Sequence, residues 1–146
     1  MALALGLGLV GVAVSATPAS AVTGGNCNFM ESQLAPGPDQ VRIPAAASGN
    51  GIVACWLAIE AKPPTVGIKE LQRAWNICYK PLNEPLISED GYFGATTQSR
   101  VRRIQMAEGL DADGVMGTKT KFTMLWPVYD YSTHTVYRGR CWSKWA

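Results

Sequence analysis

Two aspartates begin the same short motif, which occurs twice in the sequence. The motif reads D-G-x-x-G-x-x-T and starts at Asp90 and again at Asp113. A carboxylate next to a glycine can accept backbone N–H groups across a tight turn, and a threonine hydroxyl can bond to the first turn of a helix. We therefore predict two structural turns that each start a helix, formed by Asp90, Gly91, Gly94, Thr97, Asp113, Gly114, Gly117 and Thr120.

Acidic residues near these turns could also perform chemistry. Hydrolysis of a glycosidic bond needs two carboxyl groups, one of which has its pKa raised in a cleft. The acids available are Glu89 or Asp90 together with Glu108 or Asp111. Their surroundings are typical of loops, so we predict no catalytic residue and keep a small glycan hydrolase as an alternative.

Few residues could bind a metal. Asp111 begins a run that resembles a calcium-binding loop, but the position that requires a bidentate glutamate is occupied by Phe122. His134 is the only histidine and no C-x-x-C pair is present, which argues against a zinc site. We predict neither a metal nor a cofactor.

The first residues of the sequence have the features of a secretory signal. Residues 1–14 are apolar and uncharged, and Ala19-Ser20-Ala21 fits a small-x-small cleavage site. The basic residues that usually precede the apolar stretch are missing, which leaves open a start further upstream. The stretch is too short to span a bilayer. We predict a signal peptide over residues 1–21 and a secreted protein without stable membrane insertion.

Secretion exposes a protein to oxidising conditions, which bears on the state of its four cysteines, Cys27, Cys55, Cys78 and Cys141. An even number in a small secreted chain is typical of two disulfide bonds, for which three pairings are possible. We favour Cys27–Cys55, which would hold the N-terminal segment to itself, and Cys78–Cys141, which would tie the C-terminal tail to the first helix. Each would contribute roughly 3–4 kcal/mol by closing a long loop.

The composition is that of one small globular domain with additional segments. The chain has 146 residues, of which 47% are apolar and 16% charged, and its net charge is +2. This weak charge, without a concentrated basic face, does not support nucleic-acid binding.

Residues 22–65 are rich in Gly and Pro, and we expect them to form an ordered arm rather than a domain with its own core. Residues 41–43 are a short strand candidate that Pro44 would end, and residues 52–57 are a second extended run. An Asn-Gly turn lies between them. We therefore predict a small hairpin in this arm.

The segment 66–126 has the periodicity of three helices. Thr65 could cap a first helix over residues 66–79, whose apolar stripe is Ile68, Leu71, Trp75 and Cys78. A second helix is expected over residues 95–108, with Gly109 placed to end it. A third is expected over residues 118–126, ended by Pro127, with Phe122, Leu125 and Trp126 facing inward.

The tail, residues 127–146, alternates aromatic and basic side chains, and residues 133–137 suggest a strand. Its rings could bind sugars or peptides, or they could cover the helical core, where Cys141 would hold them.

The ordered set of motifs resembles a known family. It comprises Leu71-Gln72, the first D-G phrase with Phe93, Val101-x-x-Ile104-Gln105, Gly109-Leu110, the second D-G phrase and Leu125. Together they are similar to the peptidoglycan-binding domain of bacterial cell-wall hydrolases, and Cys78-Tyr79 with a distal Cys141 resembles secreted versions of it. Ala95 and Thr118 stand where the family often has proline, and Ile104 stands where it has phenylalanine.

The resemblance implies a mainly α fold: a compact three-helix, disulfide-stapled bundle with short strands at both ends. It also implies binding rather than catalysis, by a secreted, monomeric, cell-wall-associated module whose partner is the glycan or the stem peptides of peptidoglycan. The expected ligand-binding residues are Tyr92, Arg100, Arg103 and Trp126, although each arginine could instead lie on a solvated helix face. A disulfide-stapled interaction or inhibitor module is a further alternative.

Overall fold

The computed structural model describes residues 25–46, 55–59 and 65–143. The predicted signal peptide, the Asn-Gly turn near residue 50 and the last three residues lie outside the described part. Four strands precede or follow the helical segment in pairs: β2 (Phe29–Leu34) and β3 (Asp39–Ala45) before it, β5 (Trp126–Asp130) and β6 (Val136–Trp142) after it. Two short strands, β1 (Gly25–Asn26) and β4 (Cys55–Trp56), pair with each other in parallel.

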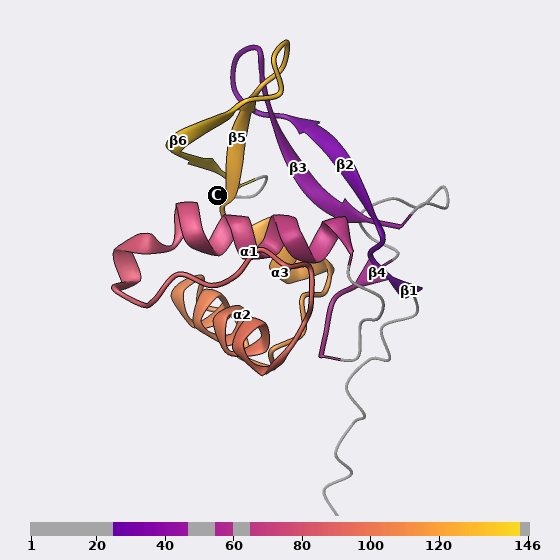
Figure 1. Ribbon diagram of the computed structural model, residues 1–146, viewed down its shortest axis with the longest axis vertical. Coiled ribbons are helices and arrows are strands. Elements are labelled where there is room, and N and C mark those ends of the chain that lie inside the picture. Colours follow the sequence, from indigo (N-terminus) through magenta and orange to yellow (C-terminus); the bar gives the residue numbers. More distant parts are fainter. Residues whose placement is uncertain (1–24, 47–54, 60–64, 144–146) are drawn as a thin grey trace, which may run out of the picture.

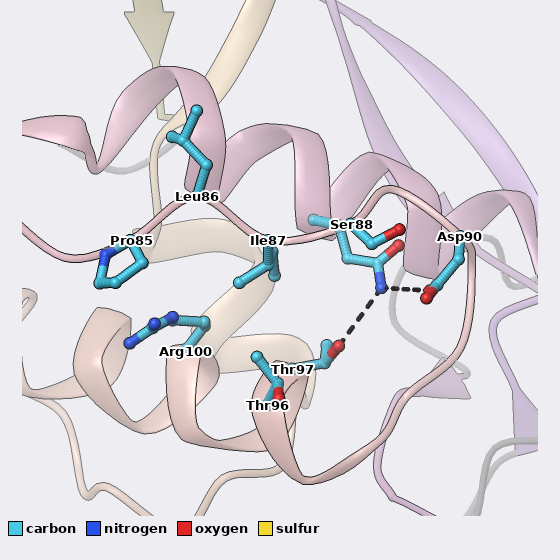
Figure 2. Close-up of a pocket in the computed structure, with 9 residues that line it drawn as sticks. Pro85, Leu86, Ile87, Ser88, Asp90, Thr96, Thr97 and Arg100 are labelled. Atoms are coloured by element: carbon cyan, nitrogen blue, oxygen red, sulfur yellow. Dashed lines mark hydrogen bonds between the residues drawn. The ribbon is translucent and has the colours of Figure 1, made fainter.

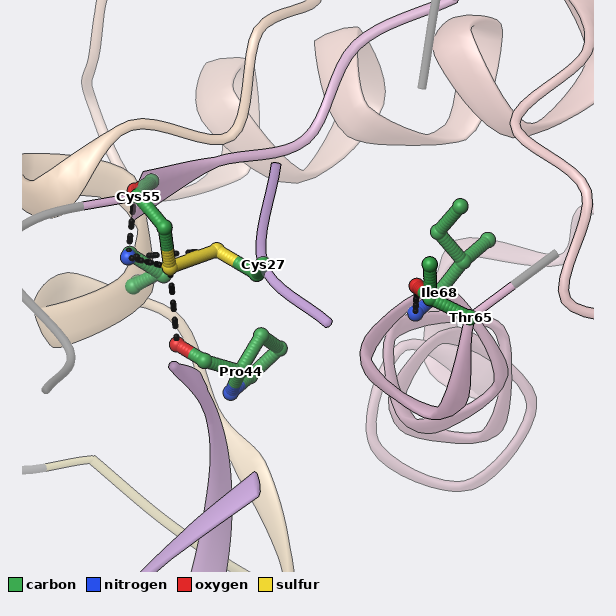
Figure 3. The surroundings of a disulfide bond; sticks show 6 residues. Cys27, Pro44, Cys55, Thr65 and Ile68 are labelled. Carbon is green, nitrogen blue, oxygen red and sulfur yellow. Dashed lines mark hydrogen bonds between the residues drawn. A yellow bond between two sulfur atoms is a disulfide. The ribbon is translucent and has the colours of Figure 1, made fainter. Parts of the chain in front are cut away.

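The first helix, α1 (Val66–Cys78), confirms the prediction from the apolar stripe. Thr65 caps it, because its hydroxyl oxygen accepts the backbone N–H of Ile68 at 3.2 Å (Figure 3). A short 3-10 turn, η2 (Lys80–Leu82), follows and includes the proline that cannot continue the helix.

The second helix, α2 (Ala95–Ala107), is also confirmed, and it ends just before Gly109. The third, α3 (Thr118–Thr123), is shorter than predicted. Met124 is already extended, and Trp126 begins strand β5 opposite Trp142. Sheet pairing therefore replaces the last predicted turn of the helix.

The prediction of a mainly α bundle is wrong. The described residues contain a four-stranded antiparallel sheet in the order β2-β3-β5-β6, and 33% of them are helical and 29% are in strands. The predicted hairpin is wrong as well, since β3 pairs with β2 and β5, while β4 pairs with β1. The sheet joins residues from both ends of the described chain, a pairing that local sequence patterns do not specify.

Two prolines lie inside strands, where the sequence predicted ends. Pro44 lies in β3 and Pro127 in β5, yet both fall outside the stretch in which these two strands pair with each other, 39–41 with 128–130. Each proline therefore has a neighbouring strand on one side only, and its missing N–H removes no bond from a doubly paired ladder.

Helix α1 is the centre of the molecule. It lies between the sheet and α2, and it contacts all four strands of that sheet (Figure 1). Its buried side chains Ile68, Leu71 and Trp75 join one hydrophobic core with sheet residues such as Val41 and Ile43. The arm, the helical segment and the tail thus share a core.

Both favoured disulfides are present. Cys27–Cys55 joins segments beside the short parallel sheet (Figure 3), and Cys78–Cys141 joins the end of α1 to β6. The second bond crosses from helix to sheet, so it fixes the C-terminal tail against α1. Helix α1 also holds the loop of the candidate site described below.

Candidate ligand-binding site

A buried glutamine on α1 holds the loop that leads into α2. The side-chain amide of Gln72 donates to Asp90 Oδ1 at 2.8 Å, to the Tyr92 carbonyl at 3.1 Å and to Thr97 Oγ1 at 3.3 Å. Its carbonyl oxygen accepts the N–H of Gly91 at 2.9 Å. One side chain therefore connects four points of the turn, which we call the first glutamine brace.

The second motif is built in the same way, one helix further along. The amide of Gln105 on α2 donates to Asp113 Oδ1 at 2.7 Å, to the Val115 carbonyl at 2.9 Å and to Thr120 Oγ1 at 3.2 Å. It accepts the Gly114 N–H at 2.9 Å. This second glutamine brace holds the loop into α3, so the sequence repeat corresponds to a repeated structural unit.

The turn residues occupy their expected places, with one difference. Gly91 and Gly114 have φ of +82° and +78°, values that favour glycine. The helices begin after Gly94 and Gly117, neither of which is capped by a side chain. The two threonines, Thr97 and Thr120, bond to the glutamines rather than to the first helical turn.

Three of the four acids considered for catalysis have structural partners. Backbone hydrogen bonding from Tyr92, with a further contribution from Gln72, lowers the pKa of Asp90. Glu89 accepts from Arg73 at 3.0 Å, and Glu108 accepts from the Tyr79 hydroxyl at 2.6 Å. A general acid needs a raised pKa, so Asp90 has the opposite of the required property.

The loop held by the first glutamine brace forms one wall of a pocket of about 370 Å³ (Figure 2). The other wall is the N-terminal half of α2, and both walls supply hydroxyl and apolar groups. The lining residues are Gln72, Pro85, Leu86, Ile87, Ser88, Asp90, Thr96, Thr97 and Arg100.

Arg100 is the cationic group of the pocket. It donates to Glu84 at 2.8 Å, lies over the Trp75 ring with its Cζ 4.9 Å from the centroid, and exposes only 14% of its side chain. Its Nε is buried and has no hydrogen-bond partner among the described residues. Buried donors are normally paired, so this N–H lacks an acceptor, and a ligand would reach it only after the guanidinium turns toward the pocket.

The other predicted ligand residues differ in position. Tyr92 is 60% exposed at the motif turn but does not line the pocket. Arg103 also does not line it, and bonds to Glu84 at 3.1 Å. Trp126 is fully buried, with its indole N–H donated to the Lys121 carbonyl at 2.7 Å. Its expected sugar-stacking role is therefore incompatible with this structure, because β5 takes the ring into the core.

Sequence reasoning missed the loop residues that shape the pocket. Glu84 bonds to both Arg100 and Arg103, and the loop from Pro85 to Ser88 supplies four of the nine lining residues. The loop composition gave no periodicity to interpret. The only available signal was an acid placed before a proline-containing loop that returns to an arginine-rich helix.

Among the described residues, no helix is long and apolar enough to cross a bilayer. Within the same ranges, no cluster of three or more His, Cys, Asp or Glu side chains could hold a metal ion.

Comparison with known proteins gives a match over the helical segment. Residues 66–124 match the family model described as "Putative peptidoglycan binding domain". A "Probable N-acetylmuramoyl-L-alanine amidase" of Bacillus licheniformis is 53% identical over 36 residues, which is 25% of this chain and 10% of that protein. The aligned region is thus a small fraction of the amidase, and no solved structure matches this chain. The segment 66–124, with its three helices and both glutamine braces, therefore matches the peptidoglycan-binding domain family that the sequence motifs indicated.

Proposed function

We propose that this protein is a secreted, monomeric, non-catalytic module that binds bacterial peptidoglycan, and that the ligand enters the pocket between the loop 83–90 and α2. The observation that carries the proposal is the buried, unpaired Nε–H of Arg100 inside the segment 66–124 that matches the binding family. The first glutamine brace fixes the loop, so binding would require movement of the Arg100 side chain but not of the loop backbone.

The lining groups indicate what part of a ligand would fit. Arg100 can donate to a carboxylate or a carbonyl oxygen, and Ser88 and Thr96 add hydroxyl groups on opposite walls. Leu86 and Ile87 provide an apolar side that suits a methyl group. Peptidoglycan has acetamido and peptide groups with this combination, so the chemistry of the pocket agrees with the match to the family.

The test is co-sedimentation of the full chain, both disulfides intact, with purified sacculi. We expect the protein to pellet with the wall and to release no soluble reducing ends. Arg100→Gln should weaken binding about tenfold, since one charge-assisted hydrogen bond of about 1.4 kcal/mol is lost.

Arg102→Gln is the matched control, because Arg102 is on the same helix but does not line the pocket. It should leave binding unchanged. A wild-type protein that stays in the supernatant would overturn the proposed function. Equal losses in the two variants would overturn the proposed site, and released sugar fragments would support the hydrolase instead.

A further inference from the structure

A second groove lies on the opposite side of α1, between that helix and the sheet. It has a volume of about 470 Å³, and Met30, Ser32 and Arg42 line it from the strands. Lys69 and Arg73 line it from the helix. The groove is partly outside the segment that matches the peptidoglycan-binding family, because β2 and β3 precede residue 66.

The charge of this groove is predominantly positive. It contains Arg42, Lys69 and Arg73 against one carboxylate, Glu70, which is almost fully buried. Glu70 accepts the Tyr129 hydroxyl at 2.6 Å and interacts with Arg73 at 3.5 Å. In the part of the chain that the structure describes, neither Arg42 nor Lys69 makes an ion pair. Arg42 is held over the Tyr129 ring with its Cζ 4.4 Å from the centroid, and Lys69 is exposed, so both charges face the groove without a paired carboxylate.

The groove lies beside an unprotected sheet edge. Strand β2 is the first strand of the sheet and pairs with β3 without a register shift, leaving its other edge without a strand among the described residues (Figure 1). Phe29 at one end is 56% exposed and Leu34 at the other is 72% exposed. A regular edge with exposed apolar groups is a template for another strand.

The opposite edge of the same sheet is protected. Strand β6 pairs with β5 through a register shift, contains Gly139 at a φ of +76°, and exposes Arg138 and Arg140. Irregularities and exposed charges of this kind prevent edge pairing. The contrast singles out β2 as the edge that can accept a partner.

We propose that an extended acidic segment of a partner protein adds to β2 as a fifth strand and places alternate carboxylates in the groove against Lys69 and Arg42. Backbone pairing would provide the affinity, and the two cations the preference for acidic side chains. Such a ladder needs several consecutive ordinary peptide units, which favours a protein segment over a sugar chain. Glu31 does not oppose this, because it alternates with the groove-lining Met30 and Ser32 and points to the other face of the sheet.

The test uses a peptide of six residues, the length of β2, that alternates valine and glutamate. It is titrated into the full chain with both disulfides intact, and backbone amide shifts are followed by NMR. We expect shifts in β2 and near Lys69. The matching valine–lysine peptide should not bind, and a version N-methylated at alternate residues should lose binding because it cannot form the ladder.

Lys69→Glu should weaken binding of the acidic peptide about tenfold, whereas Lys119→Glu, an exposed lysine of α3, should not. The inference is overturned if no shifts occur in β2, if both charge types bind equally, or if the N-methylated peptide binds as well. Sedimentation with sacculi tests the proposed function separately, because neither Lys69 nor Arg42 lines the pocket of the proposed function. Sacculi that produce the same β2 shifts would assign the groove to wall binding and reject a protein partner.

Discussion

Lys121 on α3 is a lysine without access to water. It is fully buried, and its Nζ donates to the Cys55 carbonyl at 2.7 Å. The sulfurs of Cys55 and Cys27 lie 3.4 and 3.6 Å from the same nitrogen. Sulfur is a weak acceptor, so burial dominates and lowers the pKa of Lys121 to about 8.

This lowered pKa predicts that stability depends on pH in a defined window. The folded value is about 8 and the unfolded value 10.5, so the unfolded chain binds more protons between them. The free energy of unfolding should therefore rise with pH over this window, relative to a Lys121→Met variant. Urea unfolding at pH 7, 8, 9 and 10 measures the difference between the two proteins.

Burial also raises the pKa of Tyr79 and Tyr129, which opposes stability above about pH 10 because the unfolded tyrosines ionise first. Both proteins share this effect, so it cancels in the comparison. Lys119→Met, at an exposed site, should give a flat difference. A flat difference for Lys121→Met as well would show that the lysine has the same pKa in the folded and unfolded states.

The buried lysine could not be predicted from the sequence. Lysine is almost always exposed, and the predicted inward face of the third helix was Phe122, Leu125 and Trp126. Only Trp126 of these three is fully buried, while Phe122 and Leu125 are partly exposed. The third helix ends at Thr123 and the chain continues as β5. The short helix therefore points Lys121 toward Cys55, which the apolar periodicity of the segment does not indicate.

At the scale of elements, each of the first two helices carries the glutamine that fixes the start of the next helix. Gln72 reaches Asp90 across 18 residues, and Gln105 reaches Asp113 across 8. The turns could be predicted because their signals, an aspartate followed by glycine, are local. The bracing could not, since nothing in the sequence around a helical glutamine indicates which loop it contacts.

The two braces predict a paired result. Gln72→Ala and Gln105→Ala should each lower the free energy of unfolding by about 2–4 kcal/mol, because each leaves a buried glycine N–H and several acceptors unpaired. Urea unfolding measures both. Gln98→Ala, on α2 and without a side-chain hydrogen bond among the described residues, is the control and should change little.

The same variants separate stability from binding. The first brace shapes the pocket and the second does not, so under conditions where both variants are folded only Gln72→Ala should reduce sedimentation with sacculi. If both variants pellet as well as the wild type, the pocket does not depend on the brace. If both fail equally, the loss is global rather than local.

At the scale of the whole molecule, the sheet places the two ends of the described chain side by side. Residues 39–41 pair with 128–130, and α1 lies between this sheet and α2. The helices could be predicted because the residues that they bring into contact lie close together in the sequence. The sequence could not predict the sheet, whose strands β2 and β3 have no partner nearby except each other and whose β5 begins with Trp126-Pro127, a typical helix end.

The arrangement predicts that helices and sheet unfold as one unit. Replacing Cys78 and Cys141 by alanine removes the bond that ties β6 to α1 and should lower the free energy of unfolding by about 4 kcal/mol, since the bond closes a long loop. Yet the hydrophobic core runs from Val41 in β3 through Trp75 in α1 to Ile104 in α2, so neither layer has a core of its own. Urea unfolding of the double variant should therefore give coincident midpoints by far-UV circular dichroism and by tryptophan fluorescence.

Replacing Cys27 and Cys55 instead, whose bond lies beside the short parallel sheet, should lower stability with the same coincidence. Separate midpoints in the Cys78/Cys141 variant would mean that the sheet is an appendage held mainly by its disulfide, and the peptidoglycan-binding segment would then be stable without it.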